Sequence, residues 1–136
     1  MSPGVRLLVA RVGLGGHGRG SGNLSRILSD AGFEVIVSAP GLTPEMVADM
    51  CVGEAVDVVL LSMPPQSGTT LTPMVMKELS RHGSQVPVVV SGVVLDTDLP
   101  VLLRAGVAAT FGPATPPRQI CEIVNGTLAK SALLAG

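Results

Sequence analysis

Aromatic residues are almost absent from this chain, which contains two phenylalanines and neither tryptophan nor tyrosine. Aromatic side chains supply the platforms on which the bases of single-stranded nucleic acid stack. Charged residues are also scarce, at 14% of the chain with a net charge of −1. Because nucleic acids and anionic membranes attract basic surfaces, we expect neither a nucleic-acid partner nor a membrane partner.

Long apolar runs are missing too. No run reaches the roughly 18 to 20 residues that cross a bilayer, and the first residues lack the long apolar segment of a signal peptide. The two cysteines, Cys51 and Cys121, stand far apart in sequence, so nothing points to a disulfide or a metal cluster. We expect a cytoplasmic protein in which both cysteines act as small buried hydrophobes on helices.

The 136 residues fit one domain, 1–136, with a core over about 5–128 and a frayed tail over 131–136. Short apolar runs alternate with segments of helical period, which predicts an α/β fold with a parallel sheet between helices. The runs are continuous in Val, Leu and Ile, as strands buried on both faces require. The predicted strands are residues 5–10, 33–38, 56–62, 86–91 and 108–111.

Apolar residues at spacings of three and four mark the inner faces of the predicted helices. These residues are Leu24, Ile27, Leu28 and Ala31; Val47, Met50 and Cys51; Leu71, Met74, Val75 and Leu79; Leu99, Leu102 and Leu103; and Ile120, Ile123, Val124, Thr127 and Leu128. Helix starts are expected at residues 43–45 and at Asp96 or Thr97. Helix ends are expected at Gly32, Gly53, Gly83 and Gly106.

Five strands of this kind predict the flavodoxin-like order 2-1-3-4-5, with a ligand crevice at the carboxyl ends of the strands. Four segments follow the first, third, fourth and fifth strands: 13–22, 62–70, 91–92 and 112–115. They are rich in Gly, Pro, Ser and Thr, so together they predict a long and nearly uncharged groove. Such a groove suits a large neutral ligand better than a nucleoside triphosphate.

The first of these loops holds six glycines between residues 13 and 22, with His17 among them. Glycine permits positive φ angles and close approach of a ligand, at an entropic cost that an ordinary connection avoids. His17 is the one side chain of this loop that can act as a neutral metal ligand or a proton carrier near pH 7. A loop histidine that merely hydrogen-bonds to backbone or water is the alternative, although such a loop does not need six glycines.

Three other known motifs match this chain poorly, because each requires a residue that is missing from the required position. Gly13-x-Gly15-x-x-Gly18 matches the dinucleotide fingerprint, but Ser38 stands near the end of the second strand where an acid should hold the ribose. A phosphate-binding P-loop requires a lysine, which this loop does not contain. A response-regulator receiver needs an aspartate at the end of the third strand, whereas Asp57 lies at its beginning.

No nucleophile paired with a base and no pair of carboxylates is apparent in the sequence. His82 fits a structural role at a helix end, where a cation suits the dipole. The hydroxyl residues Ser67, Thr69 and Thr70 could cap a helix, and Ser62 could end a strand. We therefore expect no catalytic residues in this chain alone.

The chain resembles the cobalamin-binding domain of methylmalonyl-CoA mutase and its relatives, especially those in which this domain is a separate small subunit. The likeness covers residues 5 to about 128 and shows in several segments. These are Arg6-Leu7-Leu8-Val9-Ala10-Arg11, Gly13-Leu14, Gly16-His17, Arg19-Gly20, and residues 30–36, 57–59, 61–62, 105–107, 111–113 and 115–116.

The resemblance implies a binding mode in which an Asp-x-His-x-x-Gly loop displaces the cofactor's benzimidazole and supplies histidine as the lower axial ligand of cobalt. His17 matches that ligand, Gly20 the closing glycine, and Ser62 the serine that hydrogen-bonds the buried base. Gly92 matches a glycine beside the nucleotide tail, and residues 112–115 match the segment that closes over it. The implied cofactor-binding residues are Gly15, Gly16, His17, Gly18, Arg19, Gly20, Ser62, Pro64, Ser67, Ser91, Gly92, Phe111, Gly112, Pro113 and Thr115.

The chain departs from the family pattern at four positions. Gly15 replaces the motif aspartate, Pro64 a leucine, Ser91 the first glycine of a pair, and Ala114 a glycine. The aspartate matters most, because a carboxylate on the far ring nitrogen orients a ligating histidine, and its loss costs about 10- to 100-fold in metal affinity or activity.

Two functions follow from the resemblance. In the first, the chain is the cobalamin-binding subunit of an adenosylcobalamin-dependent acyl-CoA mutase-type isomerase, with a large acyl-CoA-binding subunit as its partner. In the second, it is a non-catalytic partner or carrier module on the same fold that binds cobalamin weakly or not at all.

Overall fold

Strands and helices alternate throughout the computed structural model, which describes residues 4–13, 18–63 and 67–135. The strands are β1 (Arg6–Arg11), β2 (Glu34–Val37), β3 (Val58–Ser62), β4 (Val88–Ser91) and β5 (Ala109–Phe111). The helices are α1 (Gly18–Asp30), α2 (Pro44–Gly53), α3 (Gly68–Arg81), α4 (Leu99–Arg104) and α5 (Pro117–Ala135). All five predicted strands are present.

The strands form one parallel sheet in the order β2-β1-β3-β4-β5. This confirms the predicted flavodoxin-like architecture. The order reverses between β1 and β3, which places the carboxyl ends of these two neighbours at the edge where ligands bind in open α/β sheets.

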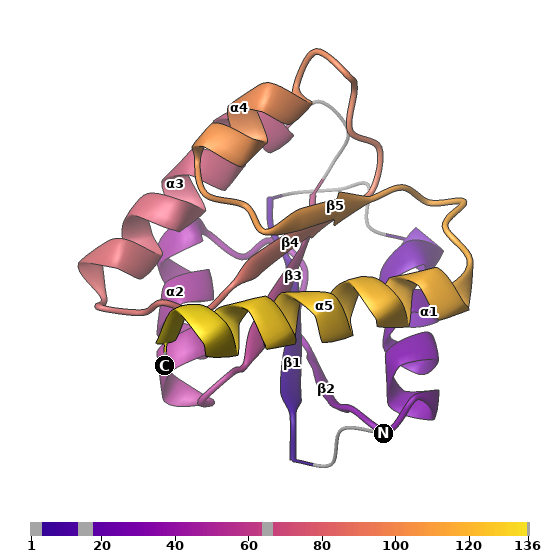
Figure 1. The fold of residues 1–136 in the computed structure, drawn as a ribbon. Helices are drawn as coiled ribbons and strands as arrows, with labels where there is room; N and C mark the ends of the chain where they lie inside the picture. Colours follow the sequence, from indigo (N-terminus) through magenta and orange to yellow (C-terminus); the bar gives the residue numbers. More distant parts are fainter. Residues whose placement is uncertain (1–3, 14–17, 64–66, 136) are drawn as a thin grey trace.

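Helices cover both faces of the sheet, with α2, α3 and α4 on one side and α1 on the other, while α5 crosses in front of the strands (Figure 1). Two clusters of buried side chains correspond to the two faces. The first packs β1, β3 and β4 against α2, α3 and α4, with Leu8, Ala10, Val59, Leu61, Val90, Val47, Val75 and Leu102 among its members. The second packs the other face against α1 and α5, with Leu7, Val9, Leu60, Val89, Phe111, Leu24, Leu28, Ile120 and Val124.

The predicted strands begin one or two residues too early, and for the second and third strands two hydrogen bonds give the reason. The backbone N–H of Phe33 donates to Leu28 O, and that of Val56 donates to Cys51 O. Each bond is the six-to-one bond of a Schellman cap, in which an apolar residue after the helix packs against its last turn. These residues are therefore apolar because they close a helix, and they only precede the strand.

Helix α2 ends at Gly53, which confirms the predicted helix end. Its cap differs from those of the other helices, because the left-handed position lies at Ala55, with φ +50°. Gly32, Gly83 and Gly106 themselves adopt positive φ after their helices.

Most predicted inner-face residues are buried, but two predictions were wrong. Met74 is 50% exposed, because α3 turns Thr72 inward, where its hydroxyl donates to Met63 Sδ at 3.6 Å. Leu103 is 52% exposed, because α4 is short and buries only Leu102. Helix α4 also begins at Leu99, later than Asp96 or Thr97.

The cysteines lie where the sequence predicts. Cys51 is buried on α2, and burial raises the pKa of its thiol to about 12, so it remains protonated. Cys121 is half-buried on α5, and burial raises its pKa as well. No helix among the described residues is long and apolar enough to span a membrane. Where the sequence predicts a frayed tail from residue 131, α5 continues to Ala135.

Candidate functional site

Four residues form one row across the carboxyl end of the sheet. In the strand register Arg11 pairs with Ser62, Ser62 with Ser91, and Ser91 with Phe111. Neighbouring strands lie about 4.8 Å apart, so the row spans about 14 Å. The register therefore brings together three predicted site residues from three separate strands, and it adds Arg11.

All four side chains of this row belong to the same face of the sheet. Side chains alternate along a strand, and Arg11, Ser62 and Ser91 each stand two residues after a member of the cluster under α1 and α5. Phe111 is itself a member and is buried. A ligand that contacts Ser62 and Ser91 therefore enters between the sheet and the helices α1 and α5.

The segment after β4 is shaped around a glycine. Gly92 has φ +124°, a conformation that side-chain-bearing residues rarely adopt, and its N–H donates to Phe111 O at 3.0 Å. A Cβ added there would meet no atom within 4 Å, so the space beside it is open. The neighbouring Ser91 hydroxyl donates to Leu61 O at 3.1 Å. Gly92 is thus required by the backbone, and it leaves room at the edge of the row.

The segment after β5 turns back toward the start of α5. The N–H of Thr115 donates to Gly112 O at 3.2 Å, which closes a tight turn that includes Pro113. A Cβ at Gly112 would also meet no atom within 4 Å. The predicted residues of this segment therefore lie together at the end of β5, beside Gly92.

Hydrogen bonds hold the end of β1 between its two neighbours. The N–H of Val12 donates to Ser62 O at 2.8 Å, and that of Leu42 donates to Arg11 O at 3.0 Å. The N–H of Arg11 donates to the hydroxyl of Ser38, which is 4% exposed and donates in turn to Ala39 O. The glycine-rich loop therefore starts from a fixed point. Sequence reasoning missed this role of Ser38, whose one signal was a hydroxyl at the end of an apolar run.

Several predicted site residues lie outside the described part of the chain. These are Gly15, Gly16, His17 and Pro64, so the histidine ligand stays a prediction. Gly18, Arg19 and Gly20 open α1. Ser67 stands just before α3, where it makes no side-chain capping bond, although its carbonyl accepts from Leu71 N at 2.8 Å. Thr69 and Thr70 lie inside that helix.

Arg11 is a residue of this site that sequence reasoning did not single out. Its Nε atom is buried and has no hydrogen-bond partner among the described residues. An unpaired buried donor costs about 1–3 kcal/mol, and more when the group is charged. Arg11 lies beside Ser62 and is the one charged residue of the row.

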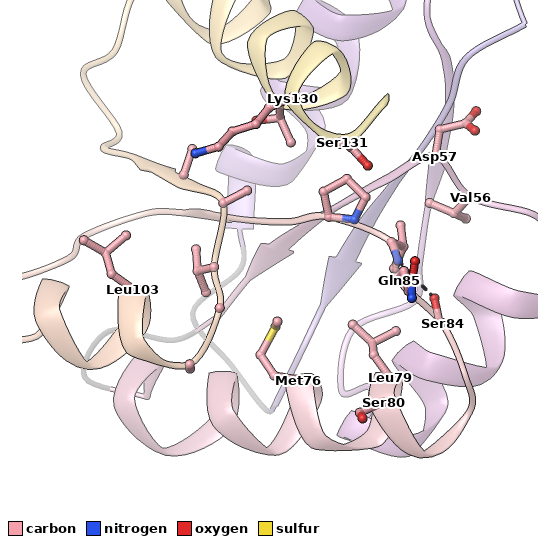
Figure 2. A pocket seen from close by; sticks show the side chains of 18 of the residues that line it. Val56, Asp57, Met76, Leu79, Ser80, Ser84, Gln85, Leu103, Lys130 and Ser131 are labelled. Carbon is pink, nitrogen blue, oxygen red and sulfur yellow. Dashed lines mark hydrogen bonds between the residues drawn. The ribbon is translucent and has the colours of Figure 1, made fainter. Parts of the chain in front are cut away.

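A groove of about 1130 Å³ lies at the opposite, amino end of the sheet, between the ends of α3, α4 and α5. Figure 2 shows Met76 pointing into it, with Lys130 and Ser131 of α5 at one side and Gln85 at another. No cluster of metal-ligating side chains is found there or elsewhere in the described chain. The groove contains none of the predicted site residues.

The charged groups at this amino end serve structural contacts. Asp57 Oδ2 accepts from Arg6 N at 2.8 Å, which places the carboxylate far from the receiver position. His82 Nδ1 contacts Glu78 O and Nε2 contacts Asp49 Oδ1, both at 2.8 Å. The backbone carbonyl and then the carboxylate raise the pKa of His82. The predicted structural role of His82 is confirmed.

Comparison with known proteins adds an independent result. A family model described as the B12 binding domain matches residues 5–121. The chain is 35% identical over 126 residues to the 2-hydroxyisobutanoyl-CoA mutase small subunit of Aquincola tertiaricarbonis, covering 92% of this chain and 93% of that one. It is 37% identical to the pivalyl-CoA mutase small subunit of Xanthobacter autotrophicus, covering 93% and 86%. The methylmalonyl-CoA mutase of Rhizobium meliloti is 32% identical, but the match spans 18% of its length.

Similarity to solved structures shows the fold alone, because the sequence identities are low. A cobalamin-binding protein from Desulfitobacterium hafniense superposes with a TM-score of 0.76 at 18% identity, covering 90% of this chain and 58% of that one. A LuxR-family response regulator from Aurantimonas superposes with a TM-score of 0.70 at 13% identity, covering 95% and 87%. Since both classes share this architecture, the fold does not separate them, whereas the family model over residues 5–121 does.

Proposed function

Since this chain belongs to the B12-binding domain family, we propose that it is the cobalamin-binding subunit of an acyl-CoA mutase-type isomerase. The observation that carries the proposal is the row at the carboxyl end of the sheet. Ser62, Ser91 and Phe111 come from three strands and share the face beneath α1 and α5. A separate large subunit, which binds the acyl-CoA, is the proposed partner, in keeping with the two small-subunit relatives.

The described residues fit the nucleotide tail of cobalamin by their chemistry. The benzimidazole is a flat, largely apolar ring with nitrogen acceptors, and the row offers hydroxyl groups beside the apolar cluster of α1 and α5. We assign Ser62 to the hydrogen bond with the base. Gly92, Gly112, Pro113 and Thr115 line the other side of the tail, where the backbone is close and no side chain fills the space at the glycines.

His17 is the proposed lower axial ligand of cobalt. Imidazole is a common ligand of transition metals in its neutral form. The loop that carries it leaves the sheet at the point that Val12 and Gly13 fix through their hydrogen bonds to Ser62 O and Leu42 O. Gly15 supplies no carboxylate for the far ring nitrogen, so the ligation is expected to be weaker than in a chain that keeps the aspartate.

Adenosylcobalamin is the proposed form of the cofactor, and it supplies the radical that initiates a 1,2-rearrangement. The protein's share is binding and orientation. This division of labour agrees with the absence of a nucleophile and base pair from the sequence. In this division the large subunit makes the contacts to the acyl-CoA, so the cofactor subunit needs no catalytic side chains.

A spectroscopic titration tests the proposal without any assay of turnover. The purified chain is titrated with hydroxocobalamin and with adenosylcobalamin, and the visible spectrum is recorded. Displacement of the benzimidazole by a protein imidazole shifts the corrin bands, so a saturable shift is expected. A spectrum that stays unchanged at cofactor concentrations about 10³-fold above a micromolar Kd would reject base-off binding through a protein imidazole and favour the carrier or scaffold function.

Paramagnetic resonance of bound cob(II)alamin then identifies the ligand. The wild-type spectrum is expected to show hyperfine coupling to one imidazole nitrogen, and His17→Ala is expected to lose it. His82→Ala is the matched control, because His82 is the other histidine of the chain and lies at the amino end of the sheet. A nitrogen pattern that survives in His17→Ala would remove His17 from the site.

A further inference from the structure

Arg11 ends β1 with a guanidinium for which the described residues supply no carboxylate. Its Nε is buried without a hydrogen-bond partner in the described structure, and no ion pair joins Arg11 to any described carboxylate. The parts that the structure does not describe, residues 1–3, 14–17, 64–66 and 136, contain no Asp or Glu. Among the described residues, Arg11 Nε therefore has neither a hydrogen-bond acceptor nor a counter-charge.

The position of Arg11 limits what that partner can be. Arg11 pairs with Ser62 across the β1–β3 step, and both side chains belong to the face beneath α1 and α5. The hydroxyl of Ser38 and the N–H of Leu42 fix the backbone of Arg11 on its other side. The guanidinium is thus attached to a rigid point about one strand spacing from the residue assigned to the base.

Cobalamin carries one anionic group in its nucleotide tail, the phosphodiester between the ribose of the base and the linker to the corrin ring. This inference rests on the proposed function, in which the base lies at Ser62 and the corrin at the loop that follows β1. The phosphodiester joins these two positions, so it has to pass the end of β1. We propose that Arg11 binds this phosphodiester through charge-assisted hydrogen bonds and thereby selects corrinoids with a phosphorylated tail.

Arginine suits this task because its planar fork of donors matches two phosphate oxygens, and because it remains charged when buried. Hydrogen bonds to charged groups contribute about 1.5–3 kcal/mol, which corresponds to about 10- to 100-fold in affinity. The contact would also satisfy the orphaned Nε. A lysine offers a point charge without the fork, so Arg11→Lys should retain only part of the effect.

Three corrinoids separate the phosphate from the rest of the cofactor. Cobinamide lacks both the phosphate and the base, cobinamide phosphate has the phosphate alone, and cobalamin has both. We expect the wild-type chain to bind cobinamide phosphate about 10-fold or more tightly than cobinamide. Arg11→Gln is expected to abolish this preference and to weaken cobalamin binding by the same factor, while its affinity for cobinamide stays unchanged.

Arg104→Gln provides the matched control, because it removes the same charge from an exposed arginine at the end of α4. It should keep the wild-type preference. Thermal unfolding shows whether each variant is folded. If Arg11→Gln is unstable, a folded Arg11→Lys variant with an intermediate preference for cobinamide phosphate over cobinamide still supports the contact.

Two results would overturn the inference while leaving the proposed function intact. One is a wild-type chain that binds cobalamin but shows no preference for cobinamide phosphate over cobinamide. The other is a folded Arg11→Gln variant that keeps the preference, or that weakens all three corrinoids equally. A wild-type chain that binds no corrinoid at all would instead reject the proposed function, and the inference with it.

Discussion

The two arginines of β1 stand at opposite ends of the same strand and in opposite electrostatic situations. Arg6 Nε is buried without a hydrogen bond, as Arg11 Nε is, but it lies 3.3 Å from Glu34 Oε2. The Arg6 guanidinium also donates to Glu54 O, and the backbone N–H of Arg6 donates to Asp57. Arg11 has a buried Nε and no described carboxylate in reach. Arg6 thus has a carboxylate partner, whereas Arg11 has none among the described residues.

The two ends of the sheet also differ in the side chains that they present. The large groove at the amino end is lined by side chains such as Leu79, Val107 and Ile123, with a few serines and Lys130 at its rim. The carboxyl end presents a row of hydroxyls, glycines with open space, and a guanidinium. The proposed site therefore rests on the chemistry of its residues and not on the volume of a groove.

Restoring the motif aspartate should produce the largest effect, and only at the carboxyl end. In Gly15→Asp the new carboxylate can orient His17 and raise its basicity, so cobalamin affinity is expected to rise about 10- to 100-fold. Isothermal titration of both chains measures the gain, and Gly15→Asn serves as the uncharged control. An equal or weaker affinity in Gly15→Asp would mean that the loop does not follow the family geometry.

Removing a contact at the amino end of the sheet should instead lower the free energy of unfolding and leave cobalamin affinity unchanged. Asp57→Ala removes the carboxylate that accepts from Arg6 N, and because Asp57 is exposed the expected loss is about 1 kcal/mol of unfolding free energy. Asp57→Asn keeps an oxygen acceptor and should lose less. Urea unfolding and cobalamin titration of both variants are the measurements. A several-fold loss of cobalamin affinity in Asp57→Ala would break the separation between the two ends.

A smaller change should stabilise the same end. Ala55 holds φ +50° after α2, a conformation that costs an L-residue about 1–2 kcal/mol. Glycine removes this cost but adds freedom to the unfolded chain, so Ala55→Gly is expected to gain about 0.5–1 kcal/mol. Ala105→Gly is the control, because Ala105 has φ −70° at the end of α4 and should lose stability. Calorimetry that finds Ala55→Gly no more stable than wild type would contradict the assigned strain.

The smallest effect should come from His82, which joins α3 to α2 near the amino end. Its pKa is raised by the carbonyl of Glu78 and by Asp49, so the protonated form stabilises the folded state. This contribution is complete below the unfolded value of 6.5 and is lost as the pH rises through the higher folded pKa. Unfolding free energies from pH 5 to 9 should therefore fall more in wild type than in Asp49→Asn. If the unfolding free energy depends equally on pH in the two chains, the contact between His82 and Asp49 does not contribute to stability.

Sequence reasoning recovered the architecture and most of the row for a shared physical reason. Parallel strands buried on both faces read as unbroken apolar runs, and their carboxyl ends meet at one edge. A serine at the end of one such run therefore predicts a neighbour at the end of the next, as Ser62 and Ser91 show.

The residues that sequence reasoning missed depend on tertiary contacts. The periodicity of α3 allows either Met74 or Thr72 to face inward, and the thioether of Met63 decides for Thr72. Ala55 takes a glycine-like conformation that no propensity predicts. Arg11 becomes informative only when the register places it beside Ser62 and its missing partner is apparent. The histidine ligand stays a prediction, because His17 lies outside the described residues.

The most direct test of the account is a crystal structure of the chain grown with excess cobalamin. The account predicts the benzimidazole beside Ser62, between the sheet and the helices α1 and α5, with the phosphodiester at Arg11. A corrinoid bound in the amino-end groove beside Lys130, or a crystal in which the edge at Ser62 and Gly92 holds no corrinoid, would contradict it.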